Sequence, residues 1–502
     1  MVYPFCFLYV HDVSKRIAII GAGFGGISAA ALLARQGHQV TVFEKNEHEG
    51  GRASMWYERG FSFDMGPSWY LMPDVFEKFF AKFGKRPSEY YTLSRLDPSY
   101  RMFFGDGAPL DISSSLEENK KLFDALEPNG GAKLQTYLDQ AEYQYDSAME
   151  TFVERDYQSV MDFLDWRLAK EGIRMRMFNS LDSHVSRLFS NDRAKKILEY
   201  TTVFLGGNPK NTPALYALIA HVDFNLGVWY PQGGLHAVAT GMMRLAQEQG
   251  ATFVFNAPVE QILVSDGKAS GVRVNGVDEP FDLVVSNADY QFTESALLAP
   301  EHRSYSDAYW ESRTMAPSGF VLFLGLDKRM DSLKHHNLFL QNDWFAHFEE
   351  IFDRPAWPDA PSYYVCAPSL TDPSVAPEGK EALFVLVPVA SGLEDTDAIR
   401  TQFRDKIIAD MERVTGESIS DHIEVERIFS QRDFTERYGA FQGTALGLAH
   451  TLRQTAILRP SMRSKKVQHL FFTGQYVHPG IGVPMVVIAS TILSDSIEKQ
   501  YG

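Results

Sequence analysis

The sequence predicts an α/β protein whose parallel sheet is assembled from both ends of a long chain. Near the start, the apolar run 16–20 leads directly into the glycine-rich stretch 21–26 (GAGFGG) and an alanine-rich helix. Near the end, the apolar run 470–472 leads into a second glycine-rich stretch, 478–484 (HPGIGVP), and an apolar helix over about 485–497. We expect these two distant segments to meet around one ligand.

The first glycine-rich stretch has the GxGxxG spacing of a dinucleotide-binding turn, and it stands between a predicted strand and a predicted helix. Gly21 allows the tight turn, Gly23 lets the backbone approach a pyrophosphate, and Gly26 lets the helix pack on the strand. The helix N-terminus adds free N–H groups and a positive dipole end. This stretch therefore predicts a site for a dinucleotide phosphate.

Features downstream agree with that site. Residues 39–44 are typical of a second parallel strand, and it ends in Glu44, where an acidic side chain can meet a ribose diol. The alternative is an ordinary solvated residue at a strand end. Gly50, Gly51 and Arg52 add small residues and a guanidinium that can pair with phosphate, which NAD sites do not usually carry.

The C-terminal helix suits a flavin, because a helix N-terminus can stabilise the negative charge of a reduced flavin ring. The alternative is a helix that simply docks on the sheet. Together the two glycine-rich stretches favour a flavin dinucleotide. The sequence contains no second strand-GxGxxG-helix unit, so we expect electrons to leave to a diffusible acceptor such as a quinone or dioxygen.

Composition excludes several classes of function. The chain has 502 residues, 45% of them apolar, which is enough for two or three domains with a large core. A net charge of −16 argues against nucleic acid as a partner. The 14 histidines lack ligand spacing and the two cysteines, Cys6 and Cys366, stand far apart, so we expect no metal and a reducing, cytoplasmic compartment.

Membrane contact is expected to be peripheral. The apolar stretch 2–10 is too short to span a bilayer, and no other window has the required length. The helical stretch 163–178 mixes Trp, Met and Phe with Arg and Lys in an otherwise acidic chain, which suits contact with anionic lipid. A solvated, salt-bridged helix is the alternative.

The expected architecture is a discontinuous Rossmann-like domain with an inserted substrate domain. Residues 282–289 are typical of a buried parallel strand that ends in small polar residues, where a ligand crosses. The nucleotide-binding domain is predicted over 1–72, 223–300 and 431–502. A helical, membrane-facing cap is predicted over 73–222, and a mixed sheet that floors a substrate cavity over 301–430.

Further motifs carry a resemblance. Five stretches complete the pattern: 61–67 (FSFDMGP), 205–209 (LGGNP), 227–234 (GVWYPQGG), 367–379 (APSLTDPSVAPEG) and 478–484 (HPGIGVP). Over nearly its whole length the chain resembles the bacterial phytoene desaturase-type carotenoid desaturase family, within the amine-oxidase-like flavoproteins. The last two stretches are typical of carotenoid desaturases and their close relatives.

The resemblance implies FAD-dependent removal of two hydrogens per step from a long acyclic or partly cyclised carotene. Phytoene and downstream carotenoids, including the hydroxylated substrates of 3,4-desaturases, fit that description. Hydride would pass to flavin N5 and a proton would leave the neighbouring carbon. The alternatives are an isoprenoid saturase or isomerase, an amine or protoporphyrinogen oxidase, and a non-catalytic isoprenoid carrier.

The resemblance also implies which residues hold FAD. The chain departs from the family pattern at Gln475 and Tyr476, where small residues are common, and at Met485, where many members have glycine. The expected cofactor positions are Gly21, Gly23, Phe24, Gly25, Gly26, Glu44, Lys45, Gly51, Arg52, Gly66, Pro67, Ser68, Val259, Gly474, Gln475, Val483, Pro484, Met485 and Val486.

No acid or base for the reaction stands out in the sequence. His478 and Asp64 are the candidates, and Asp223 and His221 also lie in or near family motifs. For each of the four, a structural hydrogen bond is the favoured interpretation over proton transfer.

Overall fold

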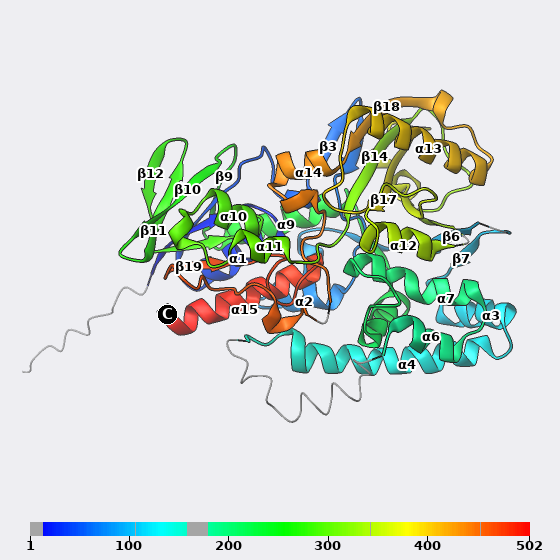
Figure 1. The fold of residues 1–502 in the computed structure, drawn as a ribbon, viewed down its shortest axis with the longest axis horizontal. Helices are drawn as coiled ribbons and strands as arrows, with labels where there is room; N and C mark the ends of the chain where they lie inside the picture. Colours follow the sequence, from blue (N-terminus) through cyan, green and yellow to red (C-terminus); the bar gives the residue numbers. More distant parts are fainter. Residues whose placement is uncertain (1–13, 106, 158–178, 342, 452) are drawn as a thin grey trace, which may run out of the picture.

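The computed structural model describes residues 14–105, 107–157, 179–341, 343–451 and 453–502. The chain forms two lobes, one around a parallel sheet and one around a larger mixed sheet (Figure 1). Among the described residues, no helix combines the length and apolar character needed to cross a membrane.

The nucleotide-binding lobe is built on a five-stranded parallel sheet that joins both ends of the chain. Its order is β19, β13, β1, β2, β9, with bounds Leu470–Phe472, Leu283–Ser286, Arg16–Ile20, Gln39–Phe43 and Thr252–Val254. The strands are short and apolar, as expected for parallel strands covered on both faces. The predicted discontinuous α/β domain is confirmed, since the C-terminal strand pairs with β13.

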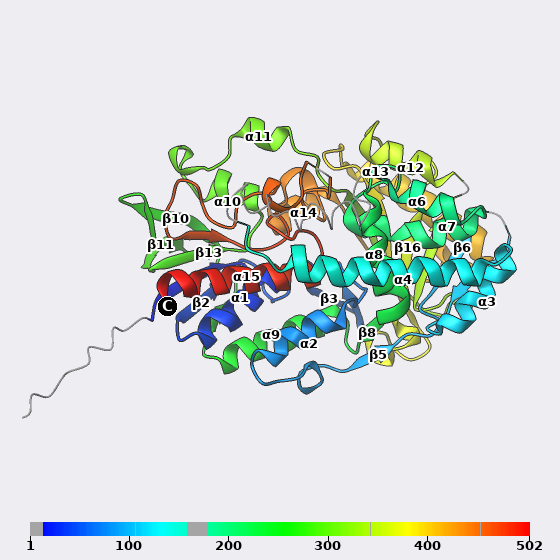
Figure 2. The ribbon, with the colours of Figure 1, turned by 90° about the horizontal axis from the view of Figure 1, so that it is seen from below.

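Helices cover one face of this sheet, side by side in Figure 2: α1 (Phe24–Arg35), α9 (Leu235–Glu248) and α15 (Val483–Tyr501). Residues 24–34 of α1 are all buried, because α9 and α15 flank it and their close approach needs its small residues. An antiparallel sheet of β10 (Val259–Ser265), β11 (Lys268–Val274) and β12 (Val277–Pro280) packs against β13 on the side away from α15.

The substrate lobe contains a seven-stranded sheet in the order β18, β14, β17, β16, β15, β6, β7. Its strands run over Ile423–Phe429, Ser318–Leu326, Glu381–Val389, Tyr363–Cys366, His336–Leu340, Tyr100–Phe104 and Leu110–Ile112. Side chains alternate between its faces. One face packs on α13 (Asp397–Thr415), where the Phe320 and Phe403 rings meet edge to face at 4.9 Å. The other face looks toward the nucleotide lobe.

The segment predicted as a helical cap contributes more than helices. Its described part is mostly helical, with α4 (Gly130–Ala148) as its longest helix (Figure 2). It also supplies β6 and β7 to the edge of the substrate sheet, and β6 pairs in parallel with β15. Neither β6 nor β15 was predicted, because each is short and their mutual pairing joins segments far apart in the chain.

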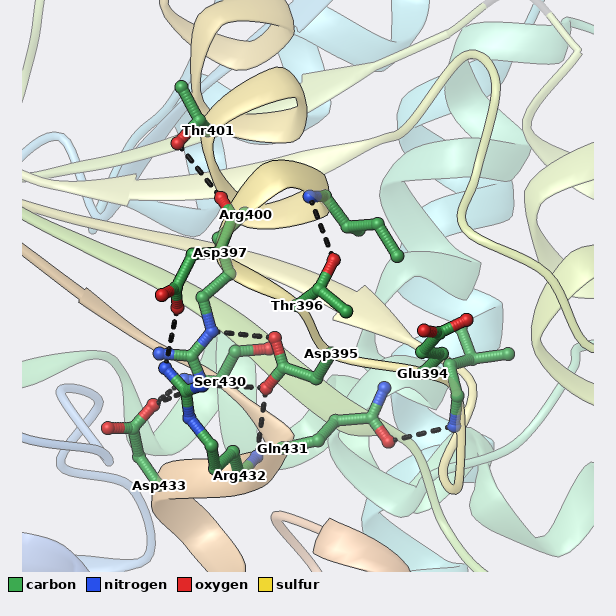
Figure 3. A network of polar contacts seen from close by, with 12 residues as sticks. Glu394, Asp395, Thr396, Asp397, Arg400, Thr401, Ser430, Gln431, Arg432 and Asp433 are labelled. Carbon is green, nitrogen blue, oxygen red and sulfur yellow. Dashed lines mark hydrogen bonds and ion pairs between the residues drawn. The ribbon is translucent and has the colours of Figure 1, made fainter.

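An ion-pair network ties the start of α13 to the start of α14 (Gln431–Tyr438), as Figure 3 shows. The guanidinium of Arg400 contacts both oxygens of Asp395 at 2.6 Å and an oxygen of Asp433 at 2.7 Å. The backbone N–H of Arg432 donates to the same Asp395 carboxylate. Arg400 and Asp395 are buried, so these charges depend on one another, and they hold α14 where it borders the site described next.

Candidate functional site

One cavity of about 530 Å³ runs from the nucleotide lobe into the substrate lobe. At one end it is lined by residues at the carboxyl ends of β1, β2, β13 and β19. At the other end it is floored by the inward face of the substrate sheet. Ligands of parallel α/β sheets bind at the carboxyl ends of the strands, so this position fits a nucleotide cofactor.

The glycine-rich turn is built from backbone contacts. Gly21 has a φ of 95°, and its N–H donates to the Phe43 carbonyl at 2.8 Å. The Gly50 N–H donates to the Ala22 carbonyl, which holds the second small-residue stretch beside the turn. A Cβ atom on Gly26 would collide with the carbonyl oxygen of Gly21. These positions therefore need glycine for close packing and leave backbone groups facing the cavity.

Glu44 lies buried at the end of β2 and lines the cavity. One carboxylate oxygen accepts from the Ala22 N–H at 2.7 Å, and the other accepts from the backbone and side chain of Asn46 at 2.9 Å. Glu44 is thus fixed beside the turn, not solvated. Each carboxylate oxygen of Glu44 has a further lone pair that can accept a hydrogen bond from a ribose hydroxyl.

Arg52 has donors to spare inside the cavity. Its NH1 donates to Gln475 Oε1 at 3.2 Å, and its guanidinium lies 5.4 Å from the centre of the Tyr438 ring. Its Nε and NH2 groups are buried and find no hydrogen-bond partner among the described residues. A buried guanidinium with unused donors fits an anionic group such as a pyrophosphate.

The C-terminal helix α15 begins at the cavity and packs on α1. Ser490 donates to the Gly25 carbonyl at 2.8 Å, so the two glycine-rich segments are joined directly. Val483, Pro484 and Val486 line the cavity at the N-terminal end of α15. Free N–H groups and the positive dipole end therefore face the ligand, as the sequence predicts.

Asn287 was not among the predicted cofactor residues, although it lies in the stretch 282–289 whose polar end was predicted to meet a ligand. It lines the cavity, and a Cβ on Gly23 or Gly474 would lie 3.0 or 3.1 Å from its side-chain amide. A Cβ on Gly25 would collide with its Oδ1. One side chain thus contacts glycines of two separate segments, and the strand-end position was its only signal in the sequence.

All but two of the predicted cofactor positions line this one cavity. Gly26 lies behind the turn, where it serves helix packing, and Met485 is part-buried and does not line the cavity. Cofactor contact at Met485 is therefore not supported by its position. The lining positions are Gly21, Gly23, Phe24, Gly25, Glu44, Lys45, Gly51, Arg52, Gly66, Pro67, Ser68, Val259, Gly474, Gln475, Val483, Pro484 and Val486.

The substrate end of the cavity is an apolar sheet face. Strand register places Val321, Leu386, Tyr364 and Leu338 in one row across four strands, all lining the cavity. Tyr364 adds a polar group to this floor. Its hydroxyl lies 2.8 Å from Ser68 Oγ and 2.6 Å from His336 Nδ1. The surface suits a long apolar ligand held next to the cofactor end.

The two catalytic candidates have structural partners outside this cavity. His478 Nε2 donates to the Val153 carbonyl at 3.0 Å, and burial lowers its pKa to about 4. The carboxylate of Asp64 accepts from the N–H groups of Leu235 and His236 and caps α9. Burial raises the pKa of Asp64 to about 7, against the effect of those two hydrogen bonds. Neither residue lines the cavity.

Asp223 and His221 also make internal contacts. Asp223 accepts from the hydroxyls of Tyr100 at 2.7 Å and Tyr200 at 3.1 Å, and burial raises its pKa to about 7. His221 Nδ1 lies 2.9 Å from Asn225 Nδ2. The lipid-binding stretch predicted over 163–178 lies outside the described residues and stays a prediction.

The residues present fit a flavin dinucleotide. The glycine turn and the α15 N-terminus supply free N–H groups, Arg52 has unused donors, and Glu44 lies where a ribose is expected. At the far end of this region, Val259 at the start of β10 lines the cavity beside Leu297 and can cover an adenine.

Comparisons with known proteins agree with this geometry. The model of the family "Flavin containing amine oxidoreductase" matches residues 24–494. A carotenoid 3,4-desaturase of Haloarcula japonica is 48% identical over 96% of this chain and 98% of its own length. A zeta-carotene-forming phytoene desaturase of Myxococcus xanthus is 36% identical over 96% of this chain and 94% of its own length.

A solved structure shares the fold at low sequence identity. The CLA-producing fatty acid isomerase of P. acnes aligns with a TM-score of 0.60 and 16% sequence identity, over 97% of this chain and 99% of that chain. Such a likeness supports the two-lobed architecture alone. The family match and the identity to the two desaturases carry more: the chain is a flavin-containing oxidoreductase and belongs to the flavin-containing amine oxidoreductase family, among its carotenoid desaturases.

Proposed function

We propose that this protein is an FAD-dependent carotenoid desaturase that removes two hydrogens from a long carotene at the C3–C4 position. The observation that carries the proposal is the single cavity that joins a dinucleotide cradle to an apolar sheet face. The bond is assigned from the 48% identity to the carotenoid 3,4-desaturase, which exceeds the 36% identity to the phytoene desaturase. Hydroxylated carotenoids are included among the substrates.

When bound, FAD supplies a two-electron acceptor that can take a hydride from an allylic carbon. The protein positions the reactants. Gly21 and its neighbours, Glu44 and Arg52 would hold the dinucleotide, and Val321, Leu338 and Leu386 would hold the polyene flat and keep water out. The proton lost from the neighbouring carbon needs only a weak acceptor, because an allylic cation is a very strong acid.

We also propose peripheral contact with a membrane and a diffusible electron acceptor, a quinone or dioxygen. A long carotene partitions into lipid, so the enzyme must take it from a bilayer. Charge reversal at Arg167, Lys170, Arg174 and Arg176 should abolish pelleting with anionic liposomes. Unchanged pelleting would reject that stretch as the contact.

The central test is anaerobic incubation of the FAD-loaded protein with single carotenes in liposomes. We expect the flavin absorption to bleach and the carotene absorption to shift to longer wavelength by one added conjugated double bond. Phytoene, an acyclic coloured carotene and its hydroxylated form are the three arms. If none of the three carotenes bleaches the flavin, the proposal is contradicted. A colourless protein that takes up no added FAD would favour an isoprenoid carrier.

A further inference from the structure

Three side chains with metal-binding atoms meet on the cavity-facing side of the substrate sheet, beside the cavity, and none of the three lines it. They are His335, His336 and Cys366, and all three are buried. One nitrogen or sulfur atom from each lies within 4.8 Å of the other two. Two imidazoles and a thiol form a donor set for borderline and soft metal ions.

Strand register creates this cluster. His336 of β15 and Cys366 of β16 are direct partners in an antiparallel pair, so their side chains leave the same face of the sheet. His335 precedes the strand, and its carbonyl accepts from the Ala367 N–H at 2.8 Å. The two histidine rings lie 4.5 Å apart at 80°. The cluster is therefore fixed by backbone pairing on both sides.

Each histidine is held through its Nδ1 atom. His335 Nδ1 lies 2.9 Å from Thr371 Oγ1, and His336 Nδ1 lies 2.6 Å from the Tyr364 hydroxyl. A hydroxyl oxygen can accept from Nδ1–H while its own proton goes elsewhere, and Tyr364 has Ser68 as that second partner. With Nδ1 protonated, each Nε2 carries a free lone pair, which is the tautomer of histidines that bind metals through Nε2.

The two Nε2 atoms have no hydrogen-bond partner among the described residues, although both are fully buried. A buried nitrogen without a partner is unfavourable, and two of them within one small cluster require an explanation. A bound cation would satisfy both at once.

Two acidic side chains lie near the cluster. Asp372 follows Thr371, the partner of His335, and its carboxylate accepts from the Gly233 N–H at 2.7 Å, while the buried Asp64 lines a small cavity together with Cys366. This small cavity, of about 20 Å³, adjoins the cluster. That is room for a single ion or one water molecule.

We propose that His335, His336 and Cys366 bind one thiophilic closed-shell cation, zinc(II) or copper(I), in a structural site on the cavity-facing side of the sheet, beside the cavity. Binding breaks the S–H bond and forms a metal–sulfur bond, the proton leaves to solvent, and no electrons are transferred. The ion would fix His336 and, through it, Tyr364 at the cavity wall. The proposed metal site does not depend on the proposed reaction. It would also give a structural role to the stretch 367–379, which contains Thr371 and Asp372.

The sequence led to the opposite expectation of no metal. Metal-binding motifs are recognised in a sequence when their ligands are a few residues apart. His336 and Cys366 lie on two different strands, and only the register between those strands brings them together. Two adjacent histidines have no standard ligand spacing either.

The test is the metal content of the full-length, flavin-loaded protein. Cells are grown with added zinc or added copper, the protein is dialysed against EDTA, and both metals are measured by mass spectrometry. We expect about one ion per chain from one of the two cultures. Cobalt(II) loaded in place of the ion should give thiolate-to-cobalt charge-transfer absorption in the near ultraviolet.

Matched variants locate the ion. Cys366→Ser and His335→Gln should each lower the metal content by at least about tenfold, since each removes a ligand. Cys6→Ser, the other cysteine, should retain it. Flavin content and circular dichroism show whether each variant is folded. If Cys366→Ser does not fold, the metal content of His335→Gln provides the test. Metal-free wild-type protein from both cultures, or a folded Cys366→Ser protein that keeps its ion, would overturn the proposal.

Discussion

The two lobes build their halves of the cavity from different material. The nucleotide lobe uses backbone: glycines, strand ends and a helix N-terminus that lie close together along short stretches of chain. The substrate lobe uses side chains on a sheet face, brought together by pairing between strands far apart in the sequence. The first half is therefore sensitive to the loss of a glycine, and the second to the size and pairing of its side chains.

The largest expected effect comes from Gly26→Val. Its Cβ would collide with the Gly21 carbonyl, so α1 cannot seat on β1 while the turn keeps its shape. We expect purified protein with less than about a tenth of the wild-type flavin content, because the clash distorts the turn that we propose binds the cofactor phosphate. Flavin absorption per chain measures it.

The control for this change is Ser28→Ala in the same helix. Ser28 is buried, and its hydroxyl has no partner among the described residues, so the loss of one oxygen should leave flavin content unchanged. A Gly26→Val protein that keeps its full flavin content would break the comparison, since the turn would then tolerate a side chain.

The same contrast explains what the sequence could predict. Gly21, Glu44, Arg52 and the start of α15 were predicted to share one site and all line one cavity, because each belongs to a local strand-turn-helix pattern whose spacing is set by backbone geometry. Asn287 was missed, since its contact with Gly25 depends on how β13 lies beside β1.

The substrate lobe was harder to predict. A mixed sheet was expected over 301–430, but β6 lies outside that range and pairs with β15 from a distant part of the chain. The register between paired strands determines which face of each strand lines the cavity, and the sequence of one strand alone does not determine that register. For the same reason neither the Tyr364 pair with Ser68 nor the cluster of His336 and Cys366 was anticipated.

The substrate lobe should lose stability through its charges. Arg400→Met removes the partner of the buried Asp395 and of Asp433, and leaving buried carboxylates unpaired costs about 4 kcal/mol of unfolding free energy. Urea unfolding measures it. Arg413→Gln, which breaks an exposed pair with Asp410, should cost less than about 1 kcal/mol. Equal losses in the two variants would contradict the role assigned to the network in Figure 3.

The next prediction concerns the pH dependence of the unfolding free energy, which the buried carboxyl group of Asp223 should affect. Burial raises the pKa of Asp223 from 3.8 to about 7, so the folded protein keeps a proton that the unfolded chain releases. Asp223 therefore lowers stability as pH rises from about 4 to 7, by about 4 kcal/mol in total, and adds no slope above that.

Asp223→Asn should remove this slope, because an amide oxygen can still accept from Tyr100 and Tyr200. The difference in unfolding free energy between the variant and the wild type should grow in favour of the variant from pH 4 to 7 and then level off. A difference that is constant with pH would show that Asp223 is ionised in the folded protein.

A smaller effect is expected from Arg52→Met in the nucleotide lobe. Loss of the guanidinium removes its unused donors from the anionic cofactor, and hydrogen bonds between charged groups contribute about 1.5–3 kcal/mol. FAD should bind about 10- to 100-fold more weakly in fluorescence titrations of the apoprotein. Arg404→Gln, which breaks a pair with Glu426 away from the cavity, should bind FAD normally. If Arg52→Met bound FAD with wild-type affinity, Arg52 would not contact the cofactor.

The smallest expected effect tests the sheet face alone. Leu386 lies in the row that lines the cavity floor, so Leu386→Trp should fill space meant for substrate and leave the glycine turn untouched. We expect kcat/KM for a carotene to fall by about tenfold, with unchanged flavin content and FAD affinity. Leu386→Met conserves volume and should keep the wild-type rate. If Leu386→Trp lost flavin and activity together, the two halves of the cavity would form one cooperative unit, and the division between backbone and side-chain sites would fail.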